Sequence, residues 1–403
     1  MISTVKRKQI LSSLLFLIII FVSFSVSPAF TNSKNGMNLL LIGVMGLSPI
    51  IIAFYVKFYQ SDKWLILFII TLILFPLAFH PDSIRWSTIM YTGMYGLTFL
   101  AYKKLLYISK FTVVDYHKLL KYLIYSYFFV LTIQQFCVLT GLPIFIVSNY
   151  DPNNPFKLNS LTSEPSHSAR ILALLMYCYI IATELIKKRS YNFRLDLKQD
   201  KWVWTCFLWV MSTMGSGTAF FFLVIVLLKF IRVKNILPLF IVIGVVVFLV
   251  NIFELSSYER TVNTFLATLT LDPDTIIEAD HGAAFRIVPM IVLANMTDLS
   301  VLDGWFGYGV DHVASFLSFY MPGLPEGFTG GGLFQLLADY GFISFILFLI
   351  FNAAHCFRKG DYLSVVIWVT IGFMQSINSQ ILWVVIIALF TNKYFSNKVK
   401  SLM

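Results

Sequence analysis

The chain has 403 residues, of which 58% are hydrophobic, 17% aromatic and only 12% charged, and its formal net charge is +10. Together with a mean hydropathy of +0.79, this composition excludes an ordinary water-soluble domain and indicates a membrane protein. The lysines and arginines are scattered between apolar runs and form no continuous basic patch, so the positive charge does not indicate nucleic-acid binding.

Apolar runs between charge clusters predict twelve membrane-spanning helices, because about 20 apolar residues cross the roughly 30 Å hydrocarbon core of a bilayer. The first run, 9–30, is longer than the apolar part of a signal peptide, so we expect it to be retained as a helix. The whole chain, 1–403, is expected to form one transmembrane domain. The twelve helices are expected to begin near Gln9, Met37, Trp64, Trp86, Leu119, Ser168, Trp202, Thr218, Asn235, Leu333, Tyr362 and Gln380.

The distribution of basic residues predicts the orientation of these helices. If the N-terminus is cytoplasmic, 24 of the 30 lysines and arginines lie on the inner side, as the positive-inside rule requires. An even number of spans then places both termini in the cytoplasm. The six cations left on the outer side are Lys34, Arg85, Lys157, Arg170, Arg260 and Arg286.

Two outer connections, 141–167 and 254–332, are longer than a simple turn requires, and long loops are usually functional or unstructured. In the second, apolar residues recur at helical spacing from Tyr258 to Leu269, and 281–295 is apolar enough for a short buried helix. We therefore expect a partly helical cap on the outer face. This loop also contains two glycine-rich turns, GWFGYG at 304–309 and GLPEGFTGGG at 323–332.

The seventh and eighth predicted helices are short, and the polar segment STMGSGT at 212–218 joins them. Polar backbone at membrane depth is tolerated only where protein or a water-filled cavity covers it, so this hairpin favours a cavity open to the outer side. The four cysteines lie in or beside apolar runs without CxxC spacing, so we predict neither a disulfide nor a zinc site. They are Cys137, Cys178, Cys206 and Cys356.

The segment LTSEPSHSAR at 161–170 carries the signals of a helix start directly before the sixth span. Ser163 is expected to cap the helix, with Glu164 and a proline in the first turn, where free N–H groups favour a bound anion. Arg170 lies one turn further on and shares a face with Ser166 and His167. These groups predict a diphosphate site, since guanidinium binds phosphate oxygens in pairs. The alternative is that Arg170 extends to the membrane interface and Glu164 only caps the helix.

Arg286 is a lone charge in apolar surroundings (HGAAFRIVP). It either pairs with an acid of its own loop or faces a shared cavity as a second phosphate ligand. His281 and His312 are candidate acid or base groups, although loop histidines are more often hydrogen-bonded surface residues. Asp339, inside the tenth span, is expected either within the membrane or at its outer mouth, paired with an arginine.

Five of these features occur in the order seen in O-antigen polymerases (Wzy) and the related O-antigen ligases. They are the SEPS segment at 163–166, the hairpin at 212–218, Arg286, the FGYG turn at 306–309 and the run QLLADYG at 335–341. The resemblance covers about 149–345 and does not include the first five spans.

The resemblance implies an all-α, GT-C-like membrane glycosyltransferase in the bacterial inner membrane, with its active site at the periplasmic face. Its partners would be an undecaprenyl-diphosphate-linked glycan donor and acceptor, membrane lipid and a protein that regulates chain length, and it would need no cofactor or metal. Arg170 and Arg286 match the diphosphate-binding arginines of family members. Many relatives carry another arginine in the hairpin, where this chain has the segment SGT at 216–218.

Ligases of this family usually have a catalytic histidine before the helix that corresponds to 333–350, where this chain has three glycines at 330–332. The resemblance therefore favours a polymerase. We expect Arg170 and Arg286 to stabilise the departing diphosphate, and Glu164, or less favourably His167, to act as the base. Two alternatives stay open, an O-antigen ligase and a flippase for lipid-linked oligosaccharides or another transporter. Aromatic residues that could pack against sugar or lipid are Tyr150, Trp305, Tyr308 and Phe328.

Overall fold

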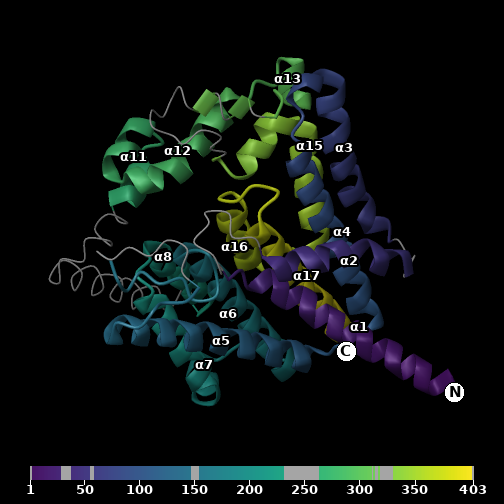
Figure 1. The fold of residues 1–403 in the computed structure, drawn as a ribbon, viewed down its shortest axis with the longest axis vertical. Coiled ribbons are helices and arrows are strands. Elements are labelled where there is room, and N and C mark those ends of the chain that lie inside the picture. The colour runs from purple at the N-terminus through teal and green to yellow at the C-terminus, as the bar shows by residue number, and fades with distance from the viewer. Residues whose placement is uncertain are drawn as a thin grey trace.

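A computed structural model describes residues 2–28, 38–54, 59–146, 154–230, 263–310, 312–313, 316–317 and 330–401. Within these ranges all regular secondary structure is helical (Figure 1). Several of the features singled out in the sequence lie outside the described residues. They are the helix expected from Asn235, the outer cations Lys34 and Arg260, the first part of the apolar stretch that begins at Tyr258, the aromatic residues Tyr150 and Phe328, and most of the glycine-rich turn at 323–332.

The other eleven predicted helices are present in the described part of the chain, and eight of them begin within three residues of the expected start. The helices expected from Gln9, Leu119 and Trp202 begin earlier, at Ile2, Val113 and Phe193. The prediction that the seventh helix is short was wrong, because it has 21 residues and its first turns are charged. The eleven helices are α1 (Ile2–Ser25), α2 (Leu39–Phe54), α3 (Lys63–Phe79), α4 (Trp86–Ile108), α5 (Val113–Thr140), α6 (Pro165–Lys187), α7 (Phe193–Thr213), α8 (Gly217–Leu227), α15 (Leu333–His355), α16 (Tyr362–Gly372) and α17 (Gln380–Lys400). Short 3-10 turns η1 (Gln60–Asp62), η2 (Pro81–Ser83) and η3 (Leu228–Phe230) flank α3 and follow α8.

Four helices are long and apolar enough to cross a membrane: Gln60–Phe79, Val113–Thr140, Pro165–Lys187 and Leu333–His355. Five shorter apolar helices accompany them in the described residues. Large apolar side chains such as Leu39, Phe54 and Leu139 are exposed on α2 and α5. Exposed apolar surface of this extent is unfavourable in water and suits a lipid environment.

The long connection at 254–332 contains helices, as the sequence predicted. These are α11 (Pro273–Ala279), α12 (His281–Met296) and α13 (Leu302–Phe306). One face of α12, with Ala284 and Val288, forms a separate apolar cluster with Ala338 of α15. Figure 1 shows α11 and α12 as one green layer beside the first half of α15, with α13 at the end of the bundle next to α3.

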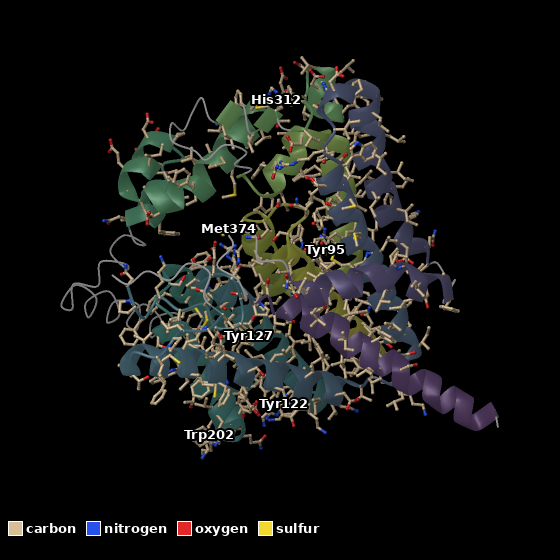
Figure 2. All side chains as sticks on the ribbon, in the orientation of Figure 1. Tyr95, Tyr122, Tyr127, Trp202, His312 and Met374 are labelled. Carbon is tan, nitrogen blue, oxygen red and sulfur yellow. The ribbon has the colours of Figure 1, made fainter. Side chains whose placement is uncertain are left out.

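The core of the molecule lies around α6 and α17. Of the most apolar 18-residue window of α6, 83% of residues are buried, and α17 is buried over most of its length. A helix that is apolar on all sides needs protein or lipid around it, and α6 is surrounded by α5, α8 and α17. Tyr127 of α5 is fully buried in this core, and its hydroxyl donates to the carbonyl of Ser25 (2.6 Å; Figure 2).

Two of the segments that carried the family resemblance lie against each other. The backbone N–H of Tyr308 donates to the carbonyl of Ala338 (2.8 Å), which joins the FGYG turn to α15. α15 is kinked at Gly341, which has φ +80°. A Cβ atom on Gly307 (φ +101°) would lie 2.3 Å from the carbonyl oxygen of Asp339, so the close approach requires glycine.

Candidate functional site

Helix α6 begins at Pro165, and Glu164 is its N-cap residue. The prediction that Ser163 caps this helix was wrong by one residue. Proline fixes φ and has no N–H, so the first helical position falls at Pro165. The hydroxyl of Ser163 instead lies 3.2 Å from Nδ1 of His167, while the hydroxyl of Thr162 donates to the carbonyl of Glu164 (2.7 Å).

The structure brings together three of the predicted site residues at this helix start. The Ser166 hydroxyl donates to Oε2 of Glu164 (3.2 Å), and Nε2 of His167 lies 3.7 Å from the same oxygen. The side chains of Glu164 and His167 are 40% and 29% exposed. A carboxylate and an imidazole therefore lie next to each other and are both accessible at the surface, where either could accept a proton from a ligand.

Arg170 lies one turn further into α6 and is only 2% exposed. An arginine that extended to a membrane interface would expose its guanidinium, so the burial of Arg170 disfavours that alternative. Ser166, four residues earlier, is also buried. A permanently charged guanidinium is thus held in the interior, one turn along α6 from the accessible His167.

The segment before α6 is fixed by hydrogen bonds to α5 and within the segment itself. The Ser160 backbone N–H donates to the side chain of Gln134 (2.9 Å), and the Ser160 hydroxyl donates to the Tyr127 carbonyl (2.7 Å). The Asn159 side chain donates to the Ser163 carbonyl (2.6 Å). The hydrogen bonds hold this helix start in one conformation, which is a requirement for a preorganised site.

The small-residue hairpin between α7 and α8 lies against the same segment. Gly215 has φ +67°, and a Cβ atom there would lie 3.2 Å from the backbone of Phe156 and Lys157. The small residues predicted as part of a cavity therefore also allow the hairpin to pack against the connection that precedes α6.

Arg286 lies in α12, but its side chain, like that of His281, is outside the described part of the structure. His312 is described. Its ring stacks on Tyr308 and Phe316, and Figure 2 shows it well apart from Tyr127, next to which the Glu164 segment is anchored. Burial and the nearby His80 lower the pKa of His312, while Asp303 opposes this change, so the imidazole favours its neutral form.

The two described aromatic candidates pack within the cap. Trp305 donates its indole N–H to the carbonyl of Leu299 (2.9 Å), and its ring meets Phe342 edge-on. The Tyr308 hydroxyl accepts a hydrogen bond from the Asp298 N–H (3.2 Å). Both residues therefore have structural partners.

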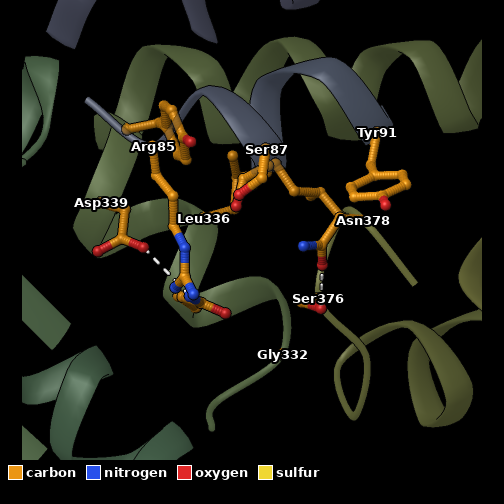
Figure 3. Close-up of a pocket in the computed structure, with 12 residues that line it drawn as sticks. Arg85, Ser87, Tyr91, Gly332, Leu336, Asp339, Ser376 and Asn378 are labelled. Atoms are coloured by element: carbon orange, nitrogen blue, oxygen red, sulfur yellow. Dashed lines mark hydrogen bonds between the residues drawn. The ribbon is translucent and has the colours of Figure 1, made fainter. Parts of the chain in front are cut away.

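A second group of polar residues, which the sequence did not predict as a site, lines a cavity of about 150 Å³ (Figure 3). Its walls come from the start of α4, the first turns of α15 and the connection between α16 and α17. Asp339, expected either inside the membrane or beside an arginine, lines this cavity together with Arg85. Arg85 had been singled out only as one of six outer cations, and no local motif marks it.

The cavity and the start of α6 lie at the same end of the bundle. The side chain of Gln380, next to the cavity wall, donates to the carbonyls of Phe24 (2.8 Å) and Val26 (3.0 Å). The N–H of Ser27 in turn donates to the carbonyl of Leu161 (2.9 Å), in the segment that leads into α6. A short series of hydrogen bonds therefore connects the two polar regions.

A buried ionic cluster lies at the other end of the bundle. Nζ of Lys103 (α4) is 2.5 Å from Oδ1 of Asp62 and 3.2 Å from Nε2 of His355 at the end of α15. All three side chains are buried. Since helix ends from α3, α4 and α15 meet here, the cluster fixes their relative positions.

Comparisons with protein-family models, with curated proteins and with solved structures found no match for this chain.

Proposed function

We propose that the chain is a membrane-embedded glycosyltransferase that polymerises oligosaccharide repeat units linked to undecaprenyl diphosphate, as O-antigen polymerases do. The observation that carries this proposal is the buried Arg170, one turn further along α6 than the accessible Glu164 and His167. A diphosphate leaving group gains negative charge as its bond to the sugar breaks. A fixed guanidinium at a helix start can stabilise that charge.

In this proposal the protein spans the bacterial inner membrane twelve times, with both termini in the cytoplasm. The orientation rests on the distribution of lysines and arginines along the sequence. Lys103 and Lys229, on the expected inner side, both bind carboxylates at helix ends away from the start of α6. The polar cavity and the Glu164 cluster would then face the periplasm, where lipid-linked repeat units are joined. Membrane lipid and a chain-length regulator would be the further partners.

The proposed reaction joins two lipid-linked glycans. A hydroxyl oxygen of the acceptor sugar forms a bond to the anomeric carbon of the donor, and the bond from that carbon to the lipid diphosphate breaks. The diphosphate leaves with the electron pair, and the hydroxyl proton passes to Glu164 or His167. Arg170, with Arg286 as a second cation, would bind the diphosphate. This scheme requires no cofactor.

The first test is the glycan ladder of a strain that lacks the protein, complemented at equal membrane levels with wild type, Arg170→Ala or Arg170→Lys. We expect wild type to restore the ladder. The alanine variant should reduce polymerisation by roughly 10²- to 10³-fold, as loss of one oxyanion-stabilising group does. Lysine should restore little, because it cannot make the paired contacts of guanidinium. Lys157→Ala, which removes an exposed cation before α6, is the matched control and should give a full ladder.

A full ladder from Arg170→Ala would contradict the site assignment. A ladder that persists in the deletion strain would contradict the polymerase itself. If complete chains accumulate on the carrier lipid in the deletion strain, the protein is a ligase that transfers finished chains and not a polymerase.

A further inference from the structure

The cavity beside α15 has a polar lining assembled from three separate parts of the chain. The residues that matter here are Arg85 and Tyr91 of the α4 region, Gln335 and Asp339 of α15, and Ser376 and Asn378 of the connection to α17. Figure 3 shows the labelled members of this group, among them Arg85, Asp339 and Asn378, on the separate segments that line the cavity. An engineered apolar cavity of about this volume, 150 Å³, holds one benzene molecule, so the space admits at most a single ring of a ligand.

The lining offers hydrogen-bond donors and acceptors in a mixture that suits sugar hydroxyl groups. The carboxylate of Asp339 only accepts, the guanidinium of Arg85 only donates, and the side-chain amide of Asn378 does both. A hydroxyl group also donates and accepts, so a sugar ring with several hydroxyls can satisfy all three kinds of partner. The ring of Tyr91 adds an apolar face against which the C–H groups of a sugar can pack.

The charges of the lining disfavour a phosphate ligand. Asp339 is 3% exposed, and its Oδ2 accepts a hydrogen bond from the amide of Gln335 (3.2 Å). A carboxylate in a buried wall repels a phosphate, and here it offsets the positive charge of Arg85. Oε1 of Gln335 is buried and makes no hydrogen bond within the described residues. A ligand hydroxyl could therefore supply the donor that this oxygen needs.

The walls of the cavity are held in place before any ligand binds. A Cβ atom on Gly332 would lie 1.6 Å from the carbonyl oxygen of Phe373, so the first turn of α15 is in direct contact with the α16 to α17 connection. Within that connection the Ser376 hydroxyl donates to the side chain of Asn378 (2.6 Å). Because these walls are already ordered, the protein loses little conformational entropy when a ligand binds. This favours a cavity that binds a specific ligand.

We infer that this cavity binds one sugar residue of the acceptor oligosaccharide and thereby positions its hydroxyl group for attack. The inference rests on the proposed function for the identity of the oligosaccharide. It deepens that function by separating the two tasks in space, with the donor diphosphate at Arg170 and the acceptor sugar between Arg85 and Asp339.

The test measures binding without turnover. The ligand is the free oligosaccharide released by mild acid from the lipid-linked repeat unit of the producing strain. The full chain in lipid nanodiscs is titrated with it, and saturation-transfer NMR gives the Kd. We expect Asp339→Asn to raise the Kd about tenfold or more, because a hydrogen bond to a charged group contributes roughly 1.5–3 kcal/mol. Asn378→Leu should raise the Kd about two- to tenfold, because a neutral hydrogen bond contributes roughly 0.5–1.5 kcal/mol. Asp82→Asn, which removes an exposed carboxylate outside the cavity, should leave the Kd unchanged.

Unchanged oligosaccharide binding in both cavity variants, or no saturable binding by wild type, would overturn the inference. Inorganic pyrophosphate is the second probe. If Asp339→Asn strengthens its binding and leaves oligosaccharide binding unchanged, the cavity is a phosphate site and the inference fails. Equal thermal unfolding of the variants and wild type excludes misfolding.

The two proposals can fail separately. If the deletion strain keeps its ladder while the chain binds the oligosaccharide through Asp339, the polymerase proposal fails and the sugar site stands. If deletion abolishes the ladder but the cavity variants bind normally, only the sugar site fails.

Discussion

Nε2 of His80 lies 2.9 Å from the carbonyl oxygen of Gly307, and the two residues are 227 positions apart in the sequence. Because a carbonyl can only accept, the imidazole donates, and it connects the turn after α3 to the FGYG turn. The same nitrogen is 3.6 Å from the carboxylate of Asp303 at the start of α13. One side chain therefore holds the cap against the end of the bundle.

We expect His80→Ala to destabilise the protein by about 1–2 kcal/mol, the cost of leaving a partly buried acceptor unsatisfied. His80→Gln should recover part of the loss, because its amide can still donate. Thermal unfolding of the purified protein in detergent measures both effects, with Asp82→Asn as a control at the same turn. A His80→Ala protein as stable as wild type would show that the cap is held by other contacts.

The requirement for glycine at position 307 can be tested by comparing substitutions at Gly307 and Gly360, because both residues have positive φ. The value is +101° at Gly307 and +81° at Gly360, but within the described residues a Cβ atom at Gly360 would meet nothing within 4 Å. Gly360→Ala should cost only the conformational penalty of roughly 1–2 kcal/mol. Gly307→Ala also forces the turn away from α15 and should greatly reduce the yield of folded protein. Size-exclusion profiles of detergent extracts measure the yield, and equal profiles would contradict the packing described here.

Much of the architecture could be predicted from the sequence, because helices that cross or line a membrane are apolar along their whole length. The run that became α6 was recognised in this way, and so was α12 within the long loop. The start of α6 was placed one residue early, at Ser163, because serine is a preferred N-cap residue and glutamate is not. In the structure Pro165 takes the first helical position, so Glu164 is the N-cap residue although its side chain makes no capping hydrogen bond.

The cavity could not be predicted because its residues come together only through tertiary packing. Arg85 lies in the short link between η2 and α4, and Asn378 lies in the connection between α16 and α17. Neither has a neighbour in sequence that marks it as functional. The FGYG turn and the run at 335–341 were recognised by their order, but nothing local indicated that Gly307 lies against Asp339.

The buried pair of Lys103 and Asp62 predicts a non-additive response to mutation. Lys103→Met leaves the Asp62 carboxylate without its closest cation, in a site where the side chains of Lys103 and Asp62 are only 3% and 1% exposed. We expect a loss of about 3–5 kcal/mol. The double variant Lys103→Met/Asp62→Asn should be more stable than Lys103→Met alone, because the uncompensated charge is gone.

A double-mutant cycle by thermal unfolding measures this coupling. Lys63→Met, which removes an exposed lysine next to Asp62, is the control and should change stability little. Additive effects of the two substitutions would show that the pair is not coupled.

Asp196, at the start of α7, predicts a pH dependence of stability. Burial alone would raise its pKa, but hydrogen bonds from Arg189 and Lys187 lower the pKa well below the ordinary value of 3.8. A lowered pKa in the folded state stabilises the protein above the unfolded pKa, and this stabilisation is lost as the pH falls below it. The contribution of Asp196 should therefore be constant between pH 7 and about pH 5 and decline below about pH 4.

Thermal unfolding of wild type and Asp196→Asn across this pH range tests the prediction. The variant should be less stable at neutral pH, and the difference should narrow in acid. A constant difference at every pH would mean that the carboxylate charge does not contribute.

Glu164 and His167 both lie at the start of α6, and substitution can decide which one accepts the proton in the proposed reaction. The carboxylate of Glu164 is the more exposed of the two, at 40%, and already accepts a hydrogen bond from the Ser166 hydroxyl. The imidazole of His167 also contacts the Ser163 hydroxyl. We expect Glu164→Gln to lower the rate of polymerisation by about 10²- to 10⁴-fold, the usual contribution of a general base. His167→Gln should lower it much less.

The measurement is the initial rate with purified protein and lipid-linked repeat units across a range of pH. Ser163→Ala is the control for disturbing the His167 ring. Because a general base is inactive when it is protonated, the rate of the wild-type protein should fall in acid. A variant that lacks the base should lose most of the activity and no longer show this fall. If His167→Gln removes the acid limb and Glu164→Gln keeps it, the imidazole is the base and Glu164 positions it.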